Sequence, residues 1–529
     1  MNHSFLILIF CILGMGLQLF AQERLPDPQI DILHYNFQLE MSASTDLVKG
    51  QTEVTVRFPQ AGTEQLVLDL DDRGMTVGEV RMNKESLTFS HKQERLQIQL
   101  PTPSKSEDTV RVWIQYEGTP EDGLIISKNK YGDRTFFGDN WPNRAHYWLP
   151  TVDHPADKAF CDFIVIAPDA YQVVANGELV EESDLSAGMR LTHWRSTVAL
   201  PTKVMVMGAA RFAVQYVGKV DGIPISSWVY PQDRDKGFFD YALAMQVVAM
   251  MAEYIGPYPY AKLANVQSKT RYGGMENASN IFYSESSVTG DRRSETLIAH
   301  EIAHQWFGNS ASEASWFHIW LSEGFATYFT SLYMEATYGR EPLLTLMQAN
   351  RTQILSSSAS RKPVVDPSVT DLNALLNTNS YQKGAWILHM LRRKIGDEDF
   401  QQSVRTYYET YQFSNALSKD FQEVVEEVSG QQLDAFFQQW LYQPGFPVLE
   451  TDWTYDAKKK SIQLSIKQTQ KGKLYQFPLD IRLDPKVKGT SIIQKLEISE
   501  KEESFSIKVP WEPYQVVLDP DTWLLFKEE

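Results

Sequence analysis

The sequence predicts a multidomain α+β protein, with a β-rich domain at each end and a mainly helical domain between them. Alternating polar and apolar runs, typical of strands, fill residues 22–229. Apolar residues then recur at helical spacing through residues 230–445, and alternation returns over residues 446–529. The 529 residues also exceed the roughly 250–300 at which one hydrophobic core stops growing. We therefore expect three folded domains with these boundaries.

Residues 1–21 are predicted to be a secretory signal peptide. The run from Phe5 to Phe20 is almost wholly apolar, and Ala21 is a suitable cleavage residue. No Lys or Arg precedes the run and Leu19 is large for its position, so a retained membrane anchor is the alternative. We expect an exported protein, periplasmic or extracellular, with no other membrane partner. Cleavage leaves Cys161 as the one cysteine, without an internal disulfide and in an apolar strand pattern.

The N-terminal domain is predicted to be all-β, with sandwich-like or saddle-like sheets. Its strand patterns lie at residues 35–41, 53–58, 66–70, 110–116 and 160–166. Residues 140–158 are rich in aromatic residues and prolines. Two interpretations of this stretch are open: a connection between strands, or a loop that reaches into a functional cleft.

The middle domain is predicted to be mainly helical, and the C-terminal domain to be a small β-sandwich. Gly339, Gly396 and Gly430 are placed to end helices. The predicted helices cover residues 238–255, 294–307, 321–338, 381–395, 400–411, 419–428 and 432–442. The final strand patterns cover residues 462–466, 477–483, 492–498, 505–509 and 514–518.

The strongest chemical signal is His300-Glu301-Ile302-Ala303-His304 on the helix predicted at 294–307. Histidines at i and i+4 lie about 40° apart around a helix, so both rings reach one metal ion. Eighteen residues separate His304 from Glu323 on the next predicted helix. Catalytic zinc takes three protein ligands and leaves one position open. We therefore predict one Zn²⁺ held by His300, His304 and Glu323, against the alternative of a chance match on an ordinary helix.

The overall charge disfavours a nucleic-acid partner. Fifty basic and 67 acidic residues give a formal net charge of −17. Nucleic acids and anionic membranes select basic surfaces. An acidic surface that keeps the protein soluble is the simpler interpretation, and the sequence carries no signal for an oligomeric state.

Four motifs in order carry a family resemblance: GGMEN at 273–277, HEIAHQWFGN at 300–309, WLSEGFA at 320–326 and YQKGA at 381–385. Together they resemble the gluzincin (M1-type) zinc aminopeptidases, typified by aminopeptidase N and leukotriene A4 hydrolase. The resemblance spans essentially the whole mature chain and implies a thermolysin-like catalytic domain. Many members continue into a large helical C-terminal domain without a counterpart in this sequence, which leads us to expect a more open cleft that admits longer peptides.

The resemblance also implies roles for individual residues. Glu301 is the general base that activates a water at the zinc ion and then protonates the leaving amine, and Tyr381 donates a hydrogen bond to the developing oxyanion. Glu276 binds the free α-amino group of the substrate. The substrate-binding segment comprises Gly273, Gly274, Met275, Glu276 and Asn277. Asp139 or Asn140 is a weaker candidate for a further contact to the amine, because the motif matches poorly there.

The predicted function is therefore a zinc metallo-aminopeptidase that removes N-terminal residues from peptides with a free N-terminus. Three alternatives differ from it: an epoxide hydrolase with residual aminopeptidase activity, an endopeptidase, and a non-enzymatic scaffold. The amine-binding Glu276 disfavours the endopeptidase, since a carboxylate there penalises blocked substrates. The presence of every ligand, Glu301 and Tyr381 disfavours the scaffold.

Overall fold

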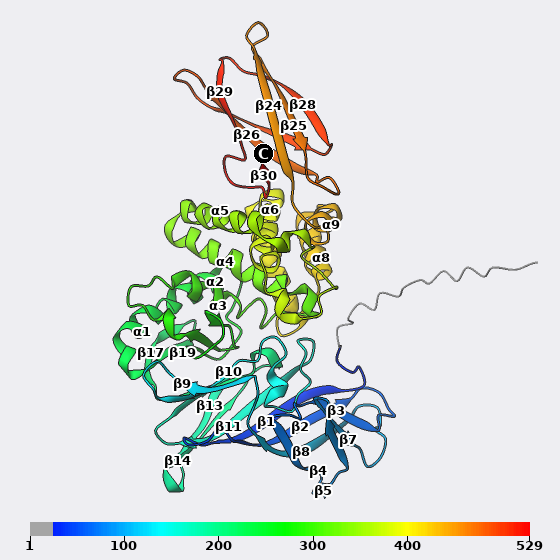
Figure 1. The fold of residues 1–529 in the computed structure, drawn as a ribbon, viewed down its shortest axis with the longest axis vertical. Helices are drawn as coiled ribbons and strands as arrows, with labels where there is room; N and C mark the ends of the chain where they lie inside the picture. The colour runs from blue at the N-terminus through cyan, green and yellow to red at the C-terminus, as the bar shows by residue number, and fades with distance from the viewer. Residues whose placement is uncertain (1–24) are drawn as a thin grey trace, which may run out of the picture.

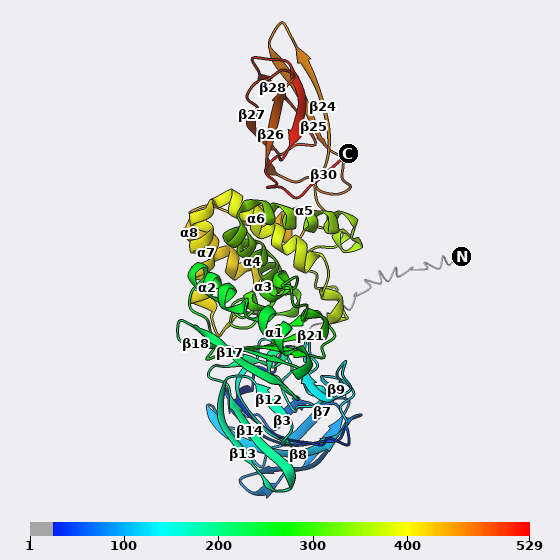
Figure 2. The ribbon, with the colours of Figure 1, turned by 90° about the vertical axis from the view of Figure 1, so that its left-hand side faces the viewer.

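The computed structural model describes residues 25–529, and the predicted signal at residues 1–21 lies outside them. Three units follow one another along the long axis of the molecule: a β-rich unit, a mainly helical unit and a second β-rich unit (Figures 1 and 2). This arrangement confirms the predicted fold class. Within residues 25–529, no helix is both long enough and apolar enough to cross a membrane.

A large sheet forms the base of the N-terminal unit. Strand β1 runs parallel to β11 and antiparallel to β2. Tyr35 and Phe37 on β1 pair with Cys161 and Phe163 on β11, and all four are buried because alternate residues face the core. Cys161 is thus the buried strand residue that the sequence predicts. In sheet order the strands are β13 Glu178–Asp184, β14 Met189–Arg195, β11 Lys158–Pro168, β1 Asp31–Met41, β2 Val48–Phe58, β8 Asp108–Gly118, β4 Met75–Met82 and β5 Glu85–Ser86, with β15 Leu200–Pro201 also paired to β11.

Two smaller sheets complete this unit. The first borders the helical unit (Figure 1) and orders β12 Gln172–Ala175, β16 Met207–Ala210, β10 Arg134–Gly138 and β9 Leu124–Lys128. The second orders β3 Gln65–Asp69, β7 Arg95–Gln99 and β6 Phe89–Lys92.

Asp162 on β11 ties three strands together and makes the stability of this unit pH-dependent. The Asp162 carboxylate accepts a hydrogen bond from Arg195 Nε at 2.8 Å. Its oxygens also lie 2.6 Å from His193 Nε2 and 2.8 Å from His34 Nε2. Burial alone would raise the pKa of Asp162, but these partners lower it to about 2. The carboxylate therefore stabilises the fold above its unfolded pKa of about 4, and this contribution is lost as the pH falls towards 2.

We expect Asp162→Asn to lower stability at pH 7 by about 1–2 kcal/mol, a value reduced for solvent screening. The measurement is the thermal unfolding midpoint of both proteins between pH 7 and pH 3. The difference between the unfolding midpoints of wild type and Asp162→Asn should be constant above pH 5 and become smaller below pH 4. Glu40→Gln on the neighbouring strand β1 is the matched control, because Glu40 makes only an exposed 3.7 Å pair with Lys49. A gap that widened in acid would contradict the assignment.

The middle unit begins with a sheet that holds one wall of the functional site. Its strands are ordered β17 Ala213–Val220, β18 Ile223–Val229, β19 Leu263–Ser268, β21 Asn280–Ser284 and β20 Gly274–Met275. Strands β17 and β18 fall within the residues predicted for the N-terminal domain, but β18 pairs in parallel with β19 of the middle unit. Alternation marks a strand without showing which sheet it joins.

Helices fill the rest of the middle unit. The helix predicted at 238–255 is interrupted at Ala242 and Leu243, and a helix that was not predicted, α5, covers Arg340–Ser356. Gly339 (φ 88°) ends α4, as the sequence predicts. The helices are α1 Arg234–Tyr241, α2 Ala244–Tyr254, α3 Glu295–Ala303, α4 Trp320–Tyr338, α5 Arg340–Ser356, α6 Gly384–Ile395, α7 Asp397–Tyr411, α8 Ser418–Ser429 and α9 Asp434–Leu441, with the short pair β22 Ser312–Glu313 and β23 Asn415–Ala416 between them.

The C-terminal unit consists of two sheets with a buried core between them, as expected of a small sandwich. One sheet orders β28 Glu502–Lys508, β25 Ser461–Gln468, β24 Val448–Asp456 and β30 Lys527–Glu528. The other orders β27 Ile492–Ile498, β26 Phe477–Pro485 and β29 Pro513–Leu518. Ile462, Leu464, Leu479 and Ile481 supply apolar side chains to the core.

Candidate metal centre and substrate site

Helix α3 positions the two histidines and the glutamate between them. The helix is shorter than predicted and ends at Ala303, but His304 keeps helical dihedral angles (φ −59°, ψ −23°). The i, i+4 relation therefore survives, and the Nε2 atoms of His300 and His304 lie 3.2 Å apart. His304 is held from behind, because its Nδ1 lies 3.0 Å from Ser322 Oγ and 3.2 Å from the Phe307 carbonyl.

Helix α4 brings Glu323 up to the histidine pair. Its Oε2 lies 3.5 Å from His300 Nε2 and 3.2 Å from His304 Nε2. One ligand atom from each of the three residues falls within 4.8 Å of the others. Since two imidazole nitrogens and a carboxylate oxygen are the ligand set of catalytic zinc, these residues fit that metal.

The charges around this cluster call for a cation. Burial would lower the pKa of His304, yet the carboxylates of Glu323 and Glu276 raise it to about 9. Burial would raise the pKa of Glu323, yet His304 and His300 hold it well below its ordinary value. A buried site with this excess of carboxylates favours bound positive charge, which zinc supplies by displacing protons from its ligands.

A close crossing of two glycines sets the position of Tyr381 relative to Glu323. A Cβ on Gly324 of α4 would lie 2.8 Å from Gly384 Cα, so only glycine permits this approach. Gly384 begins α6, directly after a π-helical turn, Asn379–Lys383, that carries Tyr381. The Tyr381 ring lies parallel to the His300 ring, with 5.9 Å between centroids. Burial and the nearby carboxylates raise the pKa of Tyr381, so its hydroxyl remains a proton donor.

The segment that contains Glu276 is fastened to the residues after α3. The Glu276 carbonyl accepts hydrogen bonds from Gln305 Nε2 at 2.8 Å and from Asn309 Nδ2 at 2.6 Å. The Glu276 carboxylate is buried, and its Oε1 has no hydrogen-bond partner among the described residues. Glu276, Glu301 and His304 form a second close cluster beside the metal ligands. A buried, unpaired carboxylate oxygen beside a cavity suits a cationic ligand.

The absence of a side chain at Gly274 on β20 leaves room for the Glu301 carboxylate. A Cβ at Gly274 would lie 2.3 Å from Glu301 Oε1 and 2.4 Å from its Cδ, whereas a Cβ at Gly273 would meet only Leu297, at 3.6 Å. The Glu301 carboxylate thus lies against the bare backbone of β20. Burial raises the pKa of Glu301 well above its ordinary value.

We expect Gly274→Ala to displace the Glu301 carboxylate and lower kcat/KM for the predicted aminopeptidase activity by about 10²-fold, the loss that follows small misplacements of reacting groups. Gly273→Ala is the matched control and should change kcat/KM far less. The measurement is steady-state hydrolysis of aminoacyl anilides, with bound zinc determined for both variants. Equal losses in the two variants would contradict the argument.

A cavity of about 220 Å³ opens over these residues. It brings together nine of the ten residues predicted for the site, together with four that the motifs did not mark. The lining comprises Trp141, Tyr272, Gly273, Gly274, Met275, Glu276, Leu297, His300, Glu301, His304, Glu323, Leu376 and Tyr381. Asn277 is the predicted residue that does not reach it, since it lies fully buried behind the loop.

The stretch at 140–158 contributes to the site only through its start. Asp139 accepts from Thr270 Oγ1 and the Arg271 amide, and Asn140 donates to the carbonyls of Thr202 and Met205. Both polar residues therefore hold the loop in place, and neither lines the cavity. The residue that does is Trp141, from the N-terminal unit.

The fold and this site define a class of protein: a metallopeptidase with the gluzincin ligand set, two histidines on one helix and a glutamate on the next. The Peptidase M1 N-terminal domain matches residues 32–204, and the Peptidase family M1 domain matches residues 239–440. These matches together cover more than two thirds of the chain. The chain belongs to the M1 family of zinc metallopeptidases.

Individual relatives agree with this assignment. The leucyl aminopeptidase of Saccharolobus solfataricus is 24% identical over 87% of this chain and 59% of its own length. Aminopeptidase N of Mus musculus is 30% identical over 57% of this chain and 34% of its own. The chain thus spans about 60% or less of these relatives.

Two solved structures share the fold. An M1 zinc metallopeptidase from Deinococcus radiodurans superposes with a TM-score of 0.70 at 22% identity, covering 80% of this chain and 96% of that one. Aminopeptidase A of Legionella pneumophila, in complex with aspartic acid, gives 0.82 at 20% identity, covering 95% of this chain and 60% of that one.

Proposed function

We propose that this protein is an aminopeptidase that hydrolyses the N-terminal peptide bond of peptides with a free N-terminus, with one zinc ion held by His300, His304 and Glu323. The observation that carries the proposal is the buried Glu276 carboxylate, one oxygen of which has no hydrogen-bond partner within residues 25–529, in the same cavity as the metal ligands. Such a carboxylate favours a substrate ammonium over an internal amide. The bound zinc would polarise the scissile carbonyl and lower the pKa of water.

Substrate binding, proton transfer and stabilisation of the developing negative charge are carried out by residues of the protein. Glu276 binds the ammonium and so places the first peptide bond beside Glu301. Glu301 takes a proton from the attacking water and passes it to the leaving amine, which its raised pKa favours. The Tyr381 hydroxyl donates a hydrogen bond to the oxygen that becomes negative. The edge strand β20 lies along the substrate backbone.

The lining also indicates the class of side chain at the cleaved residue. Apart from the glycines and the groups with assigned roles, the cavity is lined by Trp141, Tyr272, Met275, Leu297 and Leu376. These side chains are apolar or aromatic. They favour apolar residues such as leucine or methionine at the peptide N-terminus.

A panel of aminoacyl-4-nitroanilides, each paired with its N-acetylated copy, tests the proposal. We expect release of nitroaniline from the free-amine substrates alone, highest for apolar residues, and lost when zinc is removed by a chelator. Equal cleavage of the acetylated copies would overturn the role of Glu276 and indicate an endopeptidase. No cleavage by the zinc-loaded protein would overturn the proposed activity.

We also propose export to the periplasm or the extracellular space. The apolar run from Phe5 to Phe20 and the cleavage residue Ala21 support it. The test is fractionation of the expressing cells with N-terminal sequencing of the product. A chain that begins at Gln22 outside the cytoplasm is expected. A cytoplasmic chain that begins at Met1 would overturn the proposal.

A further inference from the structure

A second, larger cavity lies beyond the end of the substrate site. Its volume is about 790 Å³, within the usual range of ligand pockets, whereas the first cavity has about 220 Å³. It lies between the N-terminal unit and the short helix Leu372–Leu375 of the middle unit. Its polar lining includes Asp69, Glu94, Arg95, His146, Asp153 and Asp371.

Two tryptophans stand between the cavities. Trp141 lines the first cavity and Trp316 lines the second, and neither lines both. Their rings meet edge to face, with centroids 6.0 Å apart and planes at 84°. Each residue is only 2% exposed, so both rings are packed inside the protein and together form a partition between the cavities.

Both rings are braced from behind. Trp141 meets the Tyr272 ring edge to face at 6.4 Å, and Trp316 meets the His154 ring at 6.2 Å. The Lys203 ammonium lies 5.8 Å from the Trp316 ring centroid. The short helix Leu372–Leu375 and the residue after it continue the partition. Leu372 lines the second cavity, and Leu376 lines the first.

The partition adjoins the segments that hold Glu276, and Trp141 lines the same cavity as Glu276. Tyr272, which touches Trp141, lies four residues before Glu276. Asn309, which donates to the Glu276 carbonyl, begins the segment that leads to Trp316. With the substrate ammonium bound at Glu276, we expect a residue or acyl group attached to the substrate nitrogen to extend towards the two indole rings.

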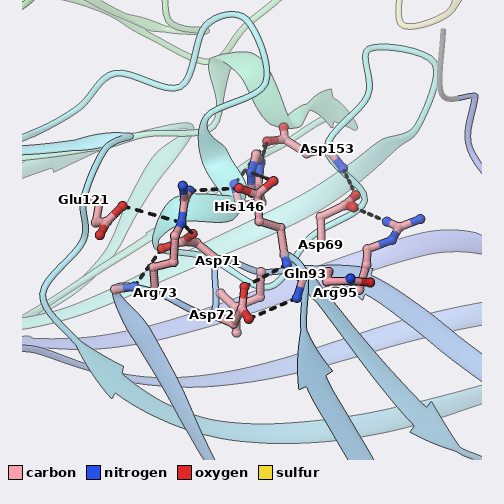
Figure 3. A network of polar contacts seen from close by, with 12 residues as sticks. Asp69, Asp71, Asp72, Arg73, Gln93, Arg95, Glu121, His146 and Asp153 are labelled. Atoms are coloured by element: carbon pink, nitrogen blue, oxygen red, sulfur yellow. Dashed lines mark hydrogen bonds and ion pairs between the residues drawn. The ribbon is translucent and has the colours of Figure 1, made fainter. Parts of the chain in front are cut away.

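The second cavity has an ordered polar wall. Figure 3 shows His146 turned towards Asp153 and Arg95 turned towards Asp69. His146 Nδ1 lies 2.8 Å from Asp153 Oδ2, and the Asp153 amide donates to Asp69 Oδ2 at 3.1 Å. The space beyond the partition is therefore shaped by fixed groups and is large enough for further residues.

We propose that the Trp141–Trp316 partition is a specificity determinant that stops the substrate one residue before the cleaved bond. This inference rests on the proposed aminopeptidase function. It implies two separate barriers to N-blocked peptides: the charge preference of Glu276 and the volume of the two indoles. Removing the charge preference alone leaves the steric barrier in place, and removing both joins the cavities so that an acylated N-terminus enters the second one.

The test is a factorial comparison of wild type, Glu276→Gln, Trp141→Ala and the double variant, with leucyl-4-nitroanilide, acetyl-leucyl-4-nitroanilide and acetyl-glycyl-leucyl-4-nitroanilide. We expect the double variant to cleave the two blocked substrates at least about tenfold faster than Glu276→Gln, a discrimination that pocket volume commonly provides. Trp141→Phe with Glu276→Gln is the matched control, since it keeps a ring in the partition and should still exclude the blocked substrates.

Trp316→Ala provides a second opening of the partition if Trp141→Ala does not fold, as judged by circular dichroism. Binding gives a readout independent of turnover: acetyl-glycyl-leucinamide should bind the zinc-free double variant in calorimetry and not bind the wild type. Rapid cleavage of blocked substrates by Glu276→Gln alone, or no gain in either folded double variant, would overturn the partition. Absence of leucyl-4-nitroanilide cleavage by wild type would instead overturn the aminopeptidase function.

Discussion

Replacing Glu301 with glutamine is expected to lower kcat/KM on free-amine aminoacyl anilides by about 10²–10⁴-fold, the usual contribution of a general base. The amide has nearly the same shape, so it still fits against Gly274, where no Cβ intervenes. It does not accept a proton from water at neutral pH. The measurement is steady-state hydrolysis by Glu301→Gln, with the zinc content of each preparation determined by mass spectrometry.

Glu295→Gln is the matched control for that experiment. Glu295 is on the same helix, in its first turn, and accepts a hydrogen bond from Tyr333 at 2.8 Å, away from the cavity. The kcat/KM of Glu295→Gln should stay close to the wild-type value. Near-wild-type activity in zinc-loaded Glu301→Gln would contradict the assignment of the base.

Lys203→Met is expected to destabilise the protein by about 3–5 kcal/mol, the cost of leaving a buried charge without its partner. Lys203 belongs to the N-terminal unit and Glu313 to β22 of the middle unit. Their Nζ and Oε1 atoms lie 2.5 Å apart, and the side chains are 1% and 0% exposed. The second oxygen of Glu313 has no partner among the described residues. Lys203 therefore provides most of the compensation for the buried negative charge of Glu313. The measurement is the thermal unfolding midpoint.

The double variant Lys203→Met, Glu313→Met distinguishes an ion pair from simple packing. Replacement of both partners by apolar groups of similar volume is commonly neutral or stabilising. The double variant should therefore recover most of the stability that Lys203→Met loses. A double variant as unstable as the single one would show that Lys203 acts through packing, for example against Trp316.

The chemistry of the metal site could be predicted from sequence because its ligands are local. His300, Glu301 and His304 share one turn, and one helical period fixes their relative directions. Glu323 needed one further step, since two predicted helices had to form a hairpin. The structure brings all of these residues to one cavity.

Residues that depend on tertiary packing were not predicted. Trp141 reaches the cavity from another unit, and Leu297 and Leu376 read as ordinary apolar residues of a helix and a loop. Asn277 follows Glu276 directly, but the backbone turns it away from the cavity. For Trp141 a signal existed: an aromatic residue beside a proline in a stretch already suspected of reaching a cleft.

The break between α1 and α2 has a similar cause. The buried Asp240 carboxylate accepts hydrogen bonds from the amides of Thr289, Gly290 and Arg292, which lie about 50 residues further along. These contacts hold the end of α1 against another segment, so the next helix starts afresh at Ala244. Helical periodicity continues across the break and does not reveal it.

The parallel pairing of β1 with β11 also constrains how the chain acquires its structure. His34 pairs with Phe160 and Glu40 with Ile166, so the central contact of the largest sheet joins residues more than 120 positions apart. Closing so long a loop is slow compared with forming a hairpin. During synthesis, the β1–β2–β8 ribbon therefore keeps an unpaired edge until β11 emerges. We therefore expect the N-terminal unit to need protection from aggregation before its folding is complete.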